Sequence, residues 1–311
     1  MVLAVLAVGK YRAYAQTPVW SDEFDGPAGS QPDPAKWNME VVADPANSEA
    51  QFYTDRDSNV SLNGAGMLVL TAYKEQVGDK QYTSGRINSA NKFSQAYGSW
   101  MARMKLPPGV GMWPAFWMLG TNNGCGRWPA CGEIDIMENR GRLASMSSSA
   151  MHGPGYSGNT PLQHVYNLPT QAGDFFSGFH LFACEWTETQ VRFFVDGNLH
   201  YTVTKPQVEA YGRWVYDHPF YAVLNLAIGG HFDGGQLPPD SAFPAQVVVD
   251  FVRVYSPGAN VSIRPIRPGV RITGVPGIEA LPIFDFMGRR VESAGEKPVR
   301  SWRPAVFFGY P

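Results

Sequence analysis

The distribution of hydrophobic and polar residues predicts a protein built from β-strands. Short runs in which apolar and polar residues alternate, or in which β-branched residues dominate, are separated by Gly, Pro, Asn and Asp, as is typical of strands and turns. Helical periodicity is nearly absent, which favours an antiparallel sandwich or barrel over an α/β fold. The clearest predicted strands are Met67–Tyr73, Ser99–Leu106, Gln190–Val195, Phe220–Ala227 and Gln246–Tyr255.

The chain is predicted to have three parts. Residues 1–15 contain a short apolar run followed by Ala13-Tyr14-Ala15, a small-x-small pattern that predicts a signal peptide and therefore an exported, extracellular or periplasmic protein. Residues 16–258 are predicted to form the main domain. Residues 259–311 form a Pro- and Arg-rich tail of unknown role. No apolar stretch has the length of a membrane span.

Charge and composition narrow the range of partners. The whole chain carries a net charge of −2, and residues 16–258 carry −8 because the flanking parts together hold a net +6. A nucleic-acid partner is therefore not expected. Aromatic residues make up 13% of the chain and include 9 Trp, which fits either a sugar-binding surface or a large sandwich core. A monomer is expected.

The 3 cysteines allow at most one disulfide. Cys125 and Cys131 flank a loop that contains Gly and Pro, and their pairing would close a small ring. Cys184 lies in an alternating strand pattern and is interpreted as a buried free thiol.

The most informative segment is the run Gly132-Glu133-Ile134-Asp135-Ile136-Met137-Glu138. Glu133 and Asp135 share one face of a strand, because side chains alternate between faces. Glu138 would point to the other face of a regular strand, and a β-bulge at Ile136-Met137 would return it to the face of Glu133.

Three carboxylates on one face repel each other, so a reaction or a cation is the expected reason for their presence. A solvated polar face and a calcium site are the alternatives. Two carboxyl groups about 5–5.5 Å apart are the requirement of retaining glycoside hydrolysis, with one as nucleophile and the other as acid/base. Crowding of the charges also raises one pKa, which keeps the acid protonated near neutral pH.

With these residues, the chain resembles glycoside hydrolase family 16 in its bulged form, Glu-x-Asp-x-x-Glu, over nearly all of residues 19–255. The surrounding motifs resemble those of bacterial laminarinases, which are endo-β-1,3-glucanases. They are residues 20–24 (WSDEF), 49–54 (EAQFYT), 83–87 (TSGRI), 111–120 (GMWPAFWMLG), 224–230 (LNLAIGG) and 249–255 (VDFVRVY).

This resemblance implies a jelly-roll β-sandwich of two bent antiparallel sheets with a concave substrate cleft. It implies endo-acting hydrolysis of β-1,3-glucosidic bonds in β-glucans, of the laminarin type or with mixed linkages, by a retaining mechanism without a catalytic cofactor. Glu133 would be the nucleophile, Glu138 the acid/base and Asp135 the residue that assists Glu133. The substrate-binding residues would be Arg86, Trp113, Trp117, His152 and Trp128. His180 is expected to support the fold.

The resemblance also implies a structural calcium ion on the convex face. Glu23 and Asp250 match the positions concerned, with backbone carbonyls filling the rest of the shell.

Two alternatives remain open. A galactan hydrolase of the agarase or carrageenase type would share the three acids, although a sulfated substrate calls for extra cationic side chains and the net −8 disfavours it. A non-catalytic β-glucan-binding protein on the same fold would be expected to lack one or both glutamates, and both are present here.

Overall fold

The computed structural model describes residues 17–122 and 124–259, together with the backbone of residues 283–284 and 290–291. The chain divides into two compact units, residues 1–265 and 266–311. In the second unit, β18 (Ile283–Phe284) pairs antiparallel with β19 (Arg290–Val291). The predicted signal peptide and most of the predicted tail lie outside the described residues. Within the described part, no helix is long and apolar enough to cross a membrane.

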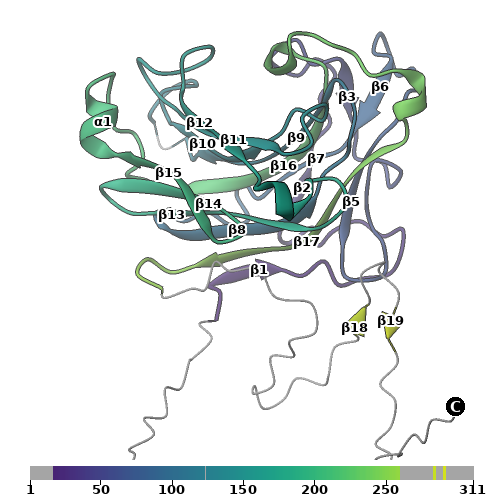
Figure 1. Cartoon of the computed structure of the whole chain (residues 1–311), viewed down its shortest axis with the longest axis horizontal. Helices are drawn as coiled ribbons and strands as arrows, with labels where there is room; N and C mark the ends of the chain where they lie inside the picture. Colours follow the sequence, from purple (N-terminus) through teal and green to yellow (C-terminus); the bar gives the residue numbers. More distant parts are fainter. Residues whose placement is uncertain (1–16, 123, 260–282, 285–289, 292–311) are drawn as a thin grey trace, which may run out of the picture. The chain divides into compact units, whose positions relative to one another are not determined.

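The first unit contains two large antiparallel sheets, one above the other in Figure 1. The first sheet has eight strands. The strand β1 (Trp20–Asp22) pairs with one part of β17, and β5 pairs with another part of it. The other strands run in the order β15 (Asn198–Thr204), β14 (Gln190–Val195), β13 (His180–Trp186), β8 (Gly98–Lys105), β17 (Ala245–Tyr255), β5 (Leu68–Ala72) and β4 (Val60–Leu62).

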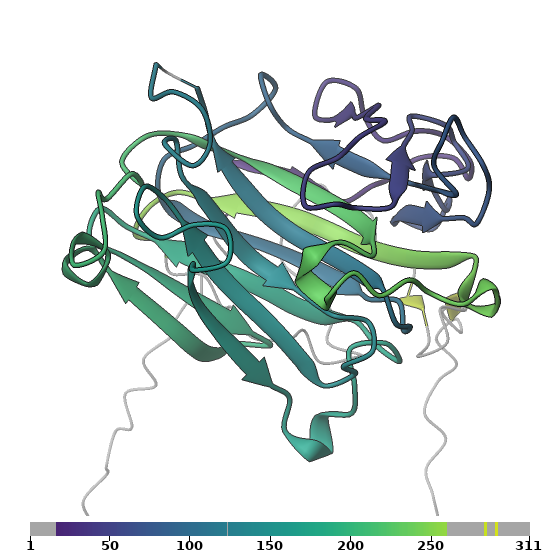
Figure 2. The same cartoon turned by 90° about the horizontal axis from the view of Figure 1, so that it is seen from above.

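The second sheet has seven strands, which lie side by side when the molecule is seen from above in Figure 2. Their order is β12 (Leu162–Asn167), β11 (Met146–His152), β10 (Glu133–Glu138), β9 (Met112–Gly120), β16 (Phe220–Ile228), β7 (Arg86–Asn88) and β2 (Asn38–Met39).

The remaining elements are short. β3 (Gln51–Tyr53) and β6 (Tyr82–Ser84) form a parallel pair. The helical pieces are α1 (Lys205–Glu209) and the 3₁₀ turns η1 (Thr170–Ala172), η2 (His231–Asp233) and η3 (Asp240–Ala242). The prediction of a jelly-roll sandwich of two antiparallel sheets is confirmed, and the predicted strands coincide with β5, β8, β14, β16 and β17 to within one or two residues.

Strand β9 shows how the sequence divides between core and cleft. Met112, Phe116 and Met118 are fully buried in the core cluster between the sheets. Trp113 and Trp117 lie on the opposite face and line a cleft. Because side chains of a strand alternate between its faces, one nine-residue strand supplies both the apolar core and two aromatic side chains of the cleft. Trp113 and Trp117 thus share the face of β9 that points into the cleft.

The structure also tests the predictions made for the three cysteines and for His180. Cys125 and Cys131 form a disulfide. Cys184, on β13, is a buried free thiol, as predicted. His180, also on β13, is buried, and its ring nitrogens lie 2.6 Å from Asp196 Oδ2 and 3.0 Å from the Asp174 carbonyl oxygen. These contacts hold the turn between β14 and β15 and the segment before β13 against the start of β13. This is the structural role predicted for His180.

Candidate active site

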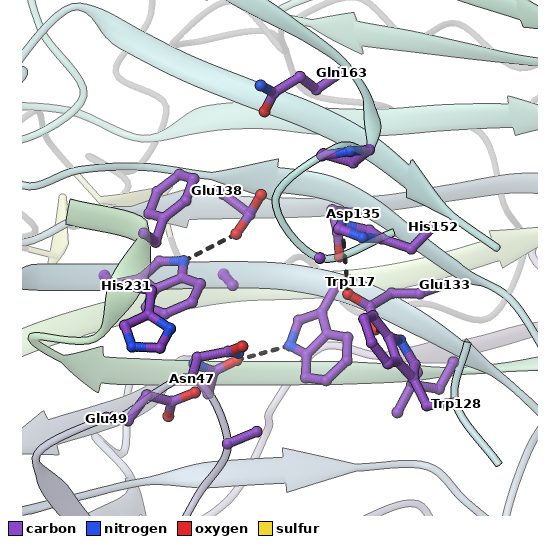
Figure 3. A pocket seen from close by; sticks show the side chains of 18 of the residues that line it. Asn47, Glu49, Trp117, Trp128, Glu133, Asp135, Glu138, His152, Gln163 and His231 are labelled. Atoms are coloured by element: carbon purple, nitrogen blue, oxygen red, sulfur yellow. Dashed lines mark hydrogen bonds and ion pairs between the residues drawn. The ribbon is translucent and has the colours of Figure 1, made fainter. Parts of the chain in front are cut away.

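A cleft of about 510 Å³ lies on the face of the second sheet that points away from the core (Figure 3). Its lining comes from β7, β9, β10, β11, β12 and β16 and from the loops above them. All the side chains predicted to act on or bind substrate line this one cleft: Arg86, Trp113, Trp117, Trp128, Glu133, Asp135, Glu138 and His152.

The predicted bulge is present in the acidic strand β10. Asp135 pairs with Trp117 of β9, whereas Met137 pairs with Phe116, so Ile136 is the extra residue. Ile136 and Met137 are both buried in the core. The bulge therefore returns Glu138 to the cleft face on which Glu133 and Asp135 lie.

Burial sets the protonation of the three acids. Burial, and next the charge of Asp135, raises the pKa of Glu133 to about 8. Burial likewise raises the pKa of Asp135 to about 7, and burial followed by the charge of Asp135 raises the pKa of Glu138 to about 8. The groups titrate together, so the site retains protons at neutral pH. A protonated carboxyl can then stand beside an ionised one, as general acid catalysis of glycoside cleavage requires.

Each glutamate accepts a hydrogen bond from an indole. Trp113 Nε1 donates to Glu138 Oε1 at 3.0 Å, and Trp128 Nε1 donates to Glu133 Oε2 at 2.8 Å. Trp128 belongs to the connection between β9 and β10 that the Cys125–Cys131 disulfide closes. These donors orient the two carboxyl groups and favour their ionised forms.

His152 lies directly across from the acids, because it pairs with Glu133 in the register of β10 and β11. Its Nε2 is 3.0 Å from Asp135 Oδ2 and 3.9 Å from Glu133 Oε1. Tyr216 donates its hydroxyl proton to the His152 carbonyl at 2.9 Å, which fixes the backbone at this position. The charge of His152 acts against burial and lowers the pKa values of Glu133 and Glu138.

Arg86 lies on β7, where its guanidinium is held by a carboxylate and two rings. Its Nε is 2.9 Å from Glu40 Oε2, and its guanidinium carbon lies 5.5 Å from the ring centres of both Tyr53 and Trp117. Trp117 Nε1 in turn donates to Asn225 Oδ1 at 2.7 Å. The cation is therefore fixed beside the Trp117 ring in the cleft.

The sequence argument assigned no role to several residues of the cleft. Glu49 is buried and accepts hydrogen bonds from Gln51 Nε2 at 2.7 Å and from the Tyr53 hydroxyl at 3.0 Å. Burial raises its pKa. Glu49 and Asn225 each lie in a segment that the family resemblance had already singled out. Their polar side chains within those segments could have identified them as residues of the cleft.

The loop around η2 forms part of the cleft wall and was also missed. Phe232 stacks on Trp113 with ring centres 4.8 Å apart, and Arg140 lies 3.8 Å from the Phe232 ring centre and donates to its carbonyl oxygen. The carboxylate of Asp233 is fully buried and accepts from Arg142 Nε at 2.8 Å. The turn that follows β10 thus holds a loop some 90 residues away along the chain.

The predicted calcium ligands lie outside the cleft, Glu23 directly after β1 and Asp250 on β17. The side chain of each is paired with an arginine. Glu23 accepts two hydrogen bonds from Arg253, at 2.8 and 2.6 Å. Asp250 Oδ2 is 2.6 Å from Arg103 Nη1. Each carboxylate is therefore already paired with an arginine, which leaves less negative charge on it for a Ca²⁺ ion. The calcium ion stays a prediction, and this arrangement argues against these two side chains as its ligands.

In the described part of the chain, one group of at least three side chains has metal-ligand geometry: Glu133, Asp135 and His152, whose ligand atoms lie within 4.8 Å of one another. These residues belong to the acidic cluster of the cleft. The geometry of that cluster is accounted for by proton sharing among carboxyl groups and does not call for a metal.

Comparison with known proteins agrees with the geometry. Residues 47–253 match the family Glycosyl hydrolases family 16. The chain is 38% identical over 247 residues to the "Beta-glucanase" of Rhodothermus marinus, covering 76% of this chain and 84% of that protein. It is 37% identical over 262 residues to "Glucan endo-1,3-beta-glucosidase A1" of Niallia circulans, covering 76% of this chain and 37% of that protein.

Among solved structures, the laminarinase catalytic domain of Thermotoga maritima MSB8 superimposes with a TM-score of 0.71 at 41% identity, covering 78% of this chain and 98% of that domain. The family match covers residues 47–253, which is most of the first unit. The chain therefore belongs to glycosyl hydrolase family 16.

Proposed function

We propose that this protein is an endo-acting β-1,3-glucanase that cleaves laminarin-type glucans with retention of configuration at the anomeric carbon. The observation that carries the proposal is the bulge at Ile136, which places Glu133, Asp135 and Glu138 on the floor of a single cleft. The cleft also contains the indoles that such an enzyme needs to orient its acids and to stack against sugar rings.

The proposed reaction has two steps. Glu138, kept protonated by burial, donates its proton to the glycosidic oxygen while the Glu133 carboxylate attacks the anomeric carbon. The resulting glycosyl-enzyme is hydrolysed by a water molecule that gives its proton to Glu138. Asp135 shares a proton with Glu133 and thereby limits the charge that accumulates between them.

The lining of the cleft supports a neutral glucan rather than a sulfated galactan. Both arginines that line it are engaged, Arg86 with Glu40 and Arg140 with Phe232 and Asp233. Each therefore already has a carboxylate beside it, which weakens its attraction for a sulfate group. The names of the Rhodothermus, Niallia and Thermotoga relatives point to the same substrate class.

Export is part of the same proposal. A polysaccharide cannot enter the cell intact, and the Cys125–Cys131 disulfide is typical of an oxidising compartment. The signal peptide of residues 1–15 and the monomeric state stay predictions. Release of residues 1–15 is checked by sequencing the N-terminus of the mature protein.

The proposal is tested by incubating the purified protein with laminarin, lichenan, agarose and κ-carrageenan and measuring new reducing ends. Fast release of short oligosaccharides from laminarin is expected, with β-configured products in the first minutes by NMR. Glu133→Gln is expected to lower kcat on laminarin by at least about 10³-fold, because it removes the nucleophile. Glu185→Gln, which changes an acid of the other sheet, is the matched control.

Other outcomes would redirect the assignment. Release from agarose or κ-carrageenan alone would support the three acids as catalytic residues but would change the assigned substrate to a galactan. Binding of laminarin without release of any oligosaccharide would make the protein a glucan-binding member of the family. Release of α-configured products would overturn retention.

A further inference from the structure

Two histidines approach each other outside the cleft, at the edges of the two sheets. His164 lies on β12, the last strand of the second sheet, and His200 lies on β15, the last strand of the first. Their Nδ1 atoms are 3.4 Å apart. The contact joins two elements that are not hydrogen-bonded neighbours in either sheet.

A second β-bulge aims His200 at this contact. Phe193 of β14 pairs with Tyr201, and the next residue, Phe194, pairs with Leu199, so His200 is the extra residue of β15. Bulges at sheet edges commonly redirect a side chain in this way. His164 pairs with Ser149 of β11, which places the serine beside the two rings.

Hydrogen bonding fixes which nitrogen of His200 carries a proton. The Ser149 hydroxyl donates its single proton to the Ile136 carbonyl oxygen at 2.7 Å. The 3.3 Å contact between Ser149 Oγ and His200 Nε2 therefore requires Nε2 to be the donor. The neutral ring then has a lone pair on Nδ1, directed at His164. Burial, and next the charge of His164, lowers the pKa of His200 to about 4, so the ring is neutral at pH 7.

A lone pair held in this way is what a metal ion requires of histidine. Metal-ligating histidines usually donate their other ring N–H to a fixed acceptor, and Ser149 is such an acceptor. With Zn–N bonds of about 2.0–2.1 Å, two nitrogens of a tetrahedral zinc site lie about 3.3–3.4 Å apart. The separation between the two Nδ1 atoms matches this value.

We propose that His164 and His200 bind one divalent transition-metal ion, of which Zn²⁺ is the representative. The ion would join β12 to β15 and so link the edges of the two sheets. His164 is exposed to solvent, which gives the ion a path of entry and leaves room for water molecules to complete its shell. The site is separate from the acidic cluster and does not depend on the proposed glucanase activity.

The test measures thermal unfolding of the EDTA-treated full chain with and without ZnCl₂ in a buffer that does not chelate metals. A ligand at 100 times its Kd stabilises the folded state enough to raise Tm by about 5–10 °C in a domain of this size. The wild type is expected to show such a rise. His164→Gln is expected to remove it, and the exposed position of His164 lets the variant fold as the wild type does. His200→Gln, which removes the other proposed ligand, is the second variant and is expected to behave in the same way.

The control variant is His152→Gln, which disrupts the other group with metal-ligand geometry, in the cleft. It is expected to keep the rise in Tm. Isothermal titration with ZnCl₂ should give one binding event fewer for His164→Gln than for the wild type. Equal rises in the wild type and His164→Gln would overturn the proposal. So would the absence of any rise in the wild type, which would leave the two rings joined only by a hydrogen bond.

Discussion

At the scale of single residues, the chemistry of the cleft comes from carboxyl groups that are removed from water. Asp135 is only 3% exposed, and its charge raises the pKa values of both neighbouring glutamates. The hydrogen bonds from Trp113 and Trp128 act in the opposite direction. The increase in pKa caused by burial is larger than the decrease caused by these hydrogen bonds. The folded state therefore binds protons that the unfolded chain has already released at neutral pH.

This imbalance predicts a stability effect for Glu138→Gln. The folded-state pKa of Glu138, about 8, lies above its ordinary value of 4.5, so the folded protein loses stability as pH rises between these values. The neutral glutamine does not incur this loss. We expect Glu138→Gln to raise the free energy of unfolding by about 2 kcal/mol or more at pH 9, with little change at pH 4.

Urea unfolding of both proteins at the two pH values measures the difference. Glu188→Gln changes an exposed glutamate between β13 and β14 and is the matched control. A stability gain of Glu138→Gln that is the same at pH 4 and pH 9 would contradict this explanation.

At the scale of elements, strand irregularities and one connection place the functional groups. The bulge in β10 determines the face of Glu138, and the bulge in β15 directs His200. The connection between β9 and β10 carries Trp128, which is 51% exposed. The exposed side chain of Trp128 is held in place by its hydrogen bond to Glu133 and by the disulfide that closes its loop.

The Trp128 contact predicts a change in the pH profile of the enzyme. Trp128→Phe keeps an aromatic ring and loses the N–H group that favours ionised Glu133. The pKa of Glu133 should therefore rise, and the acidic limb of kcat/KM on laminarin should move to higher pH by about 0.5–1 unit.

Trp117→Phe is the matched control for this prediction, because it loses an N–H group that is bonded to Asn225 rather than to an acid. It should alter KM and leave the acidic limb in place. An unchanged limb in Trp128→Phe would show that the indole acts only as a wall of the cleft.

At the scale of the whole molecule, the first unit contains every component of the proposed activity. Both large sheets, the core between them and the cleft lie within residues 1–265. The loops that form the cleft wall are held by long-range contacts of the same unit, such as that between Arg142 and Asp233.

We therefore expect a chain that ends at residue 265 to keep its stability and activity. Its Tm should lie within about 2 °C of the value for the full chain, with the same kcat/KM on laminarin. Scanning calorimetry and the reducing-end assay on both chains measure this. A fall in Tm of more than about 5 °C would assign residues 266–311 a part in the stability of the fold.

The sequence by itself determined the strand content, an antiparallel sandwich or barrel, the disulfide candidates and the acidic run with its bulge. These features depend on neighbours within a few positions along the chain, where the alternation of faces relates residue type directly to burial. The motifs then identified Arg86, Trp113, Trp117, Trp128 and His152 as residues of one site, and the structure brings them into one cleft.

Only the tertiary structure decided which side chains meet across strands that are distant in sequence. Glu40 beside Arg86, Asn225 beside Trp117 and His200 beside His164 are pairs joined by sheet register and sheet packing, which local periodicity does not encode. Contacts of this kind also bear on the calcium ion, which stays a prediction. Glu23 and Asp250 have the residue type of cation ligands, but the register of β1, β8 and β17 places an arginine against each of them. A carboxylate binds whichever cation the fold brings to it.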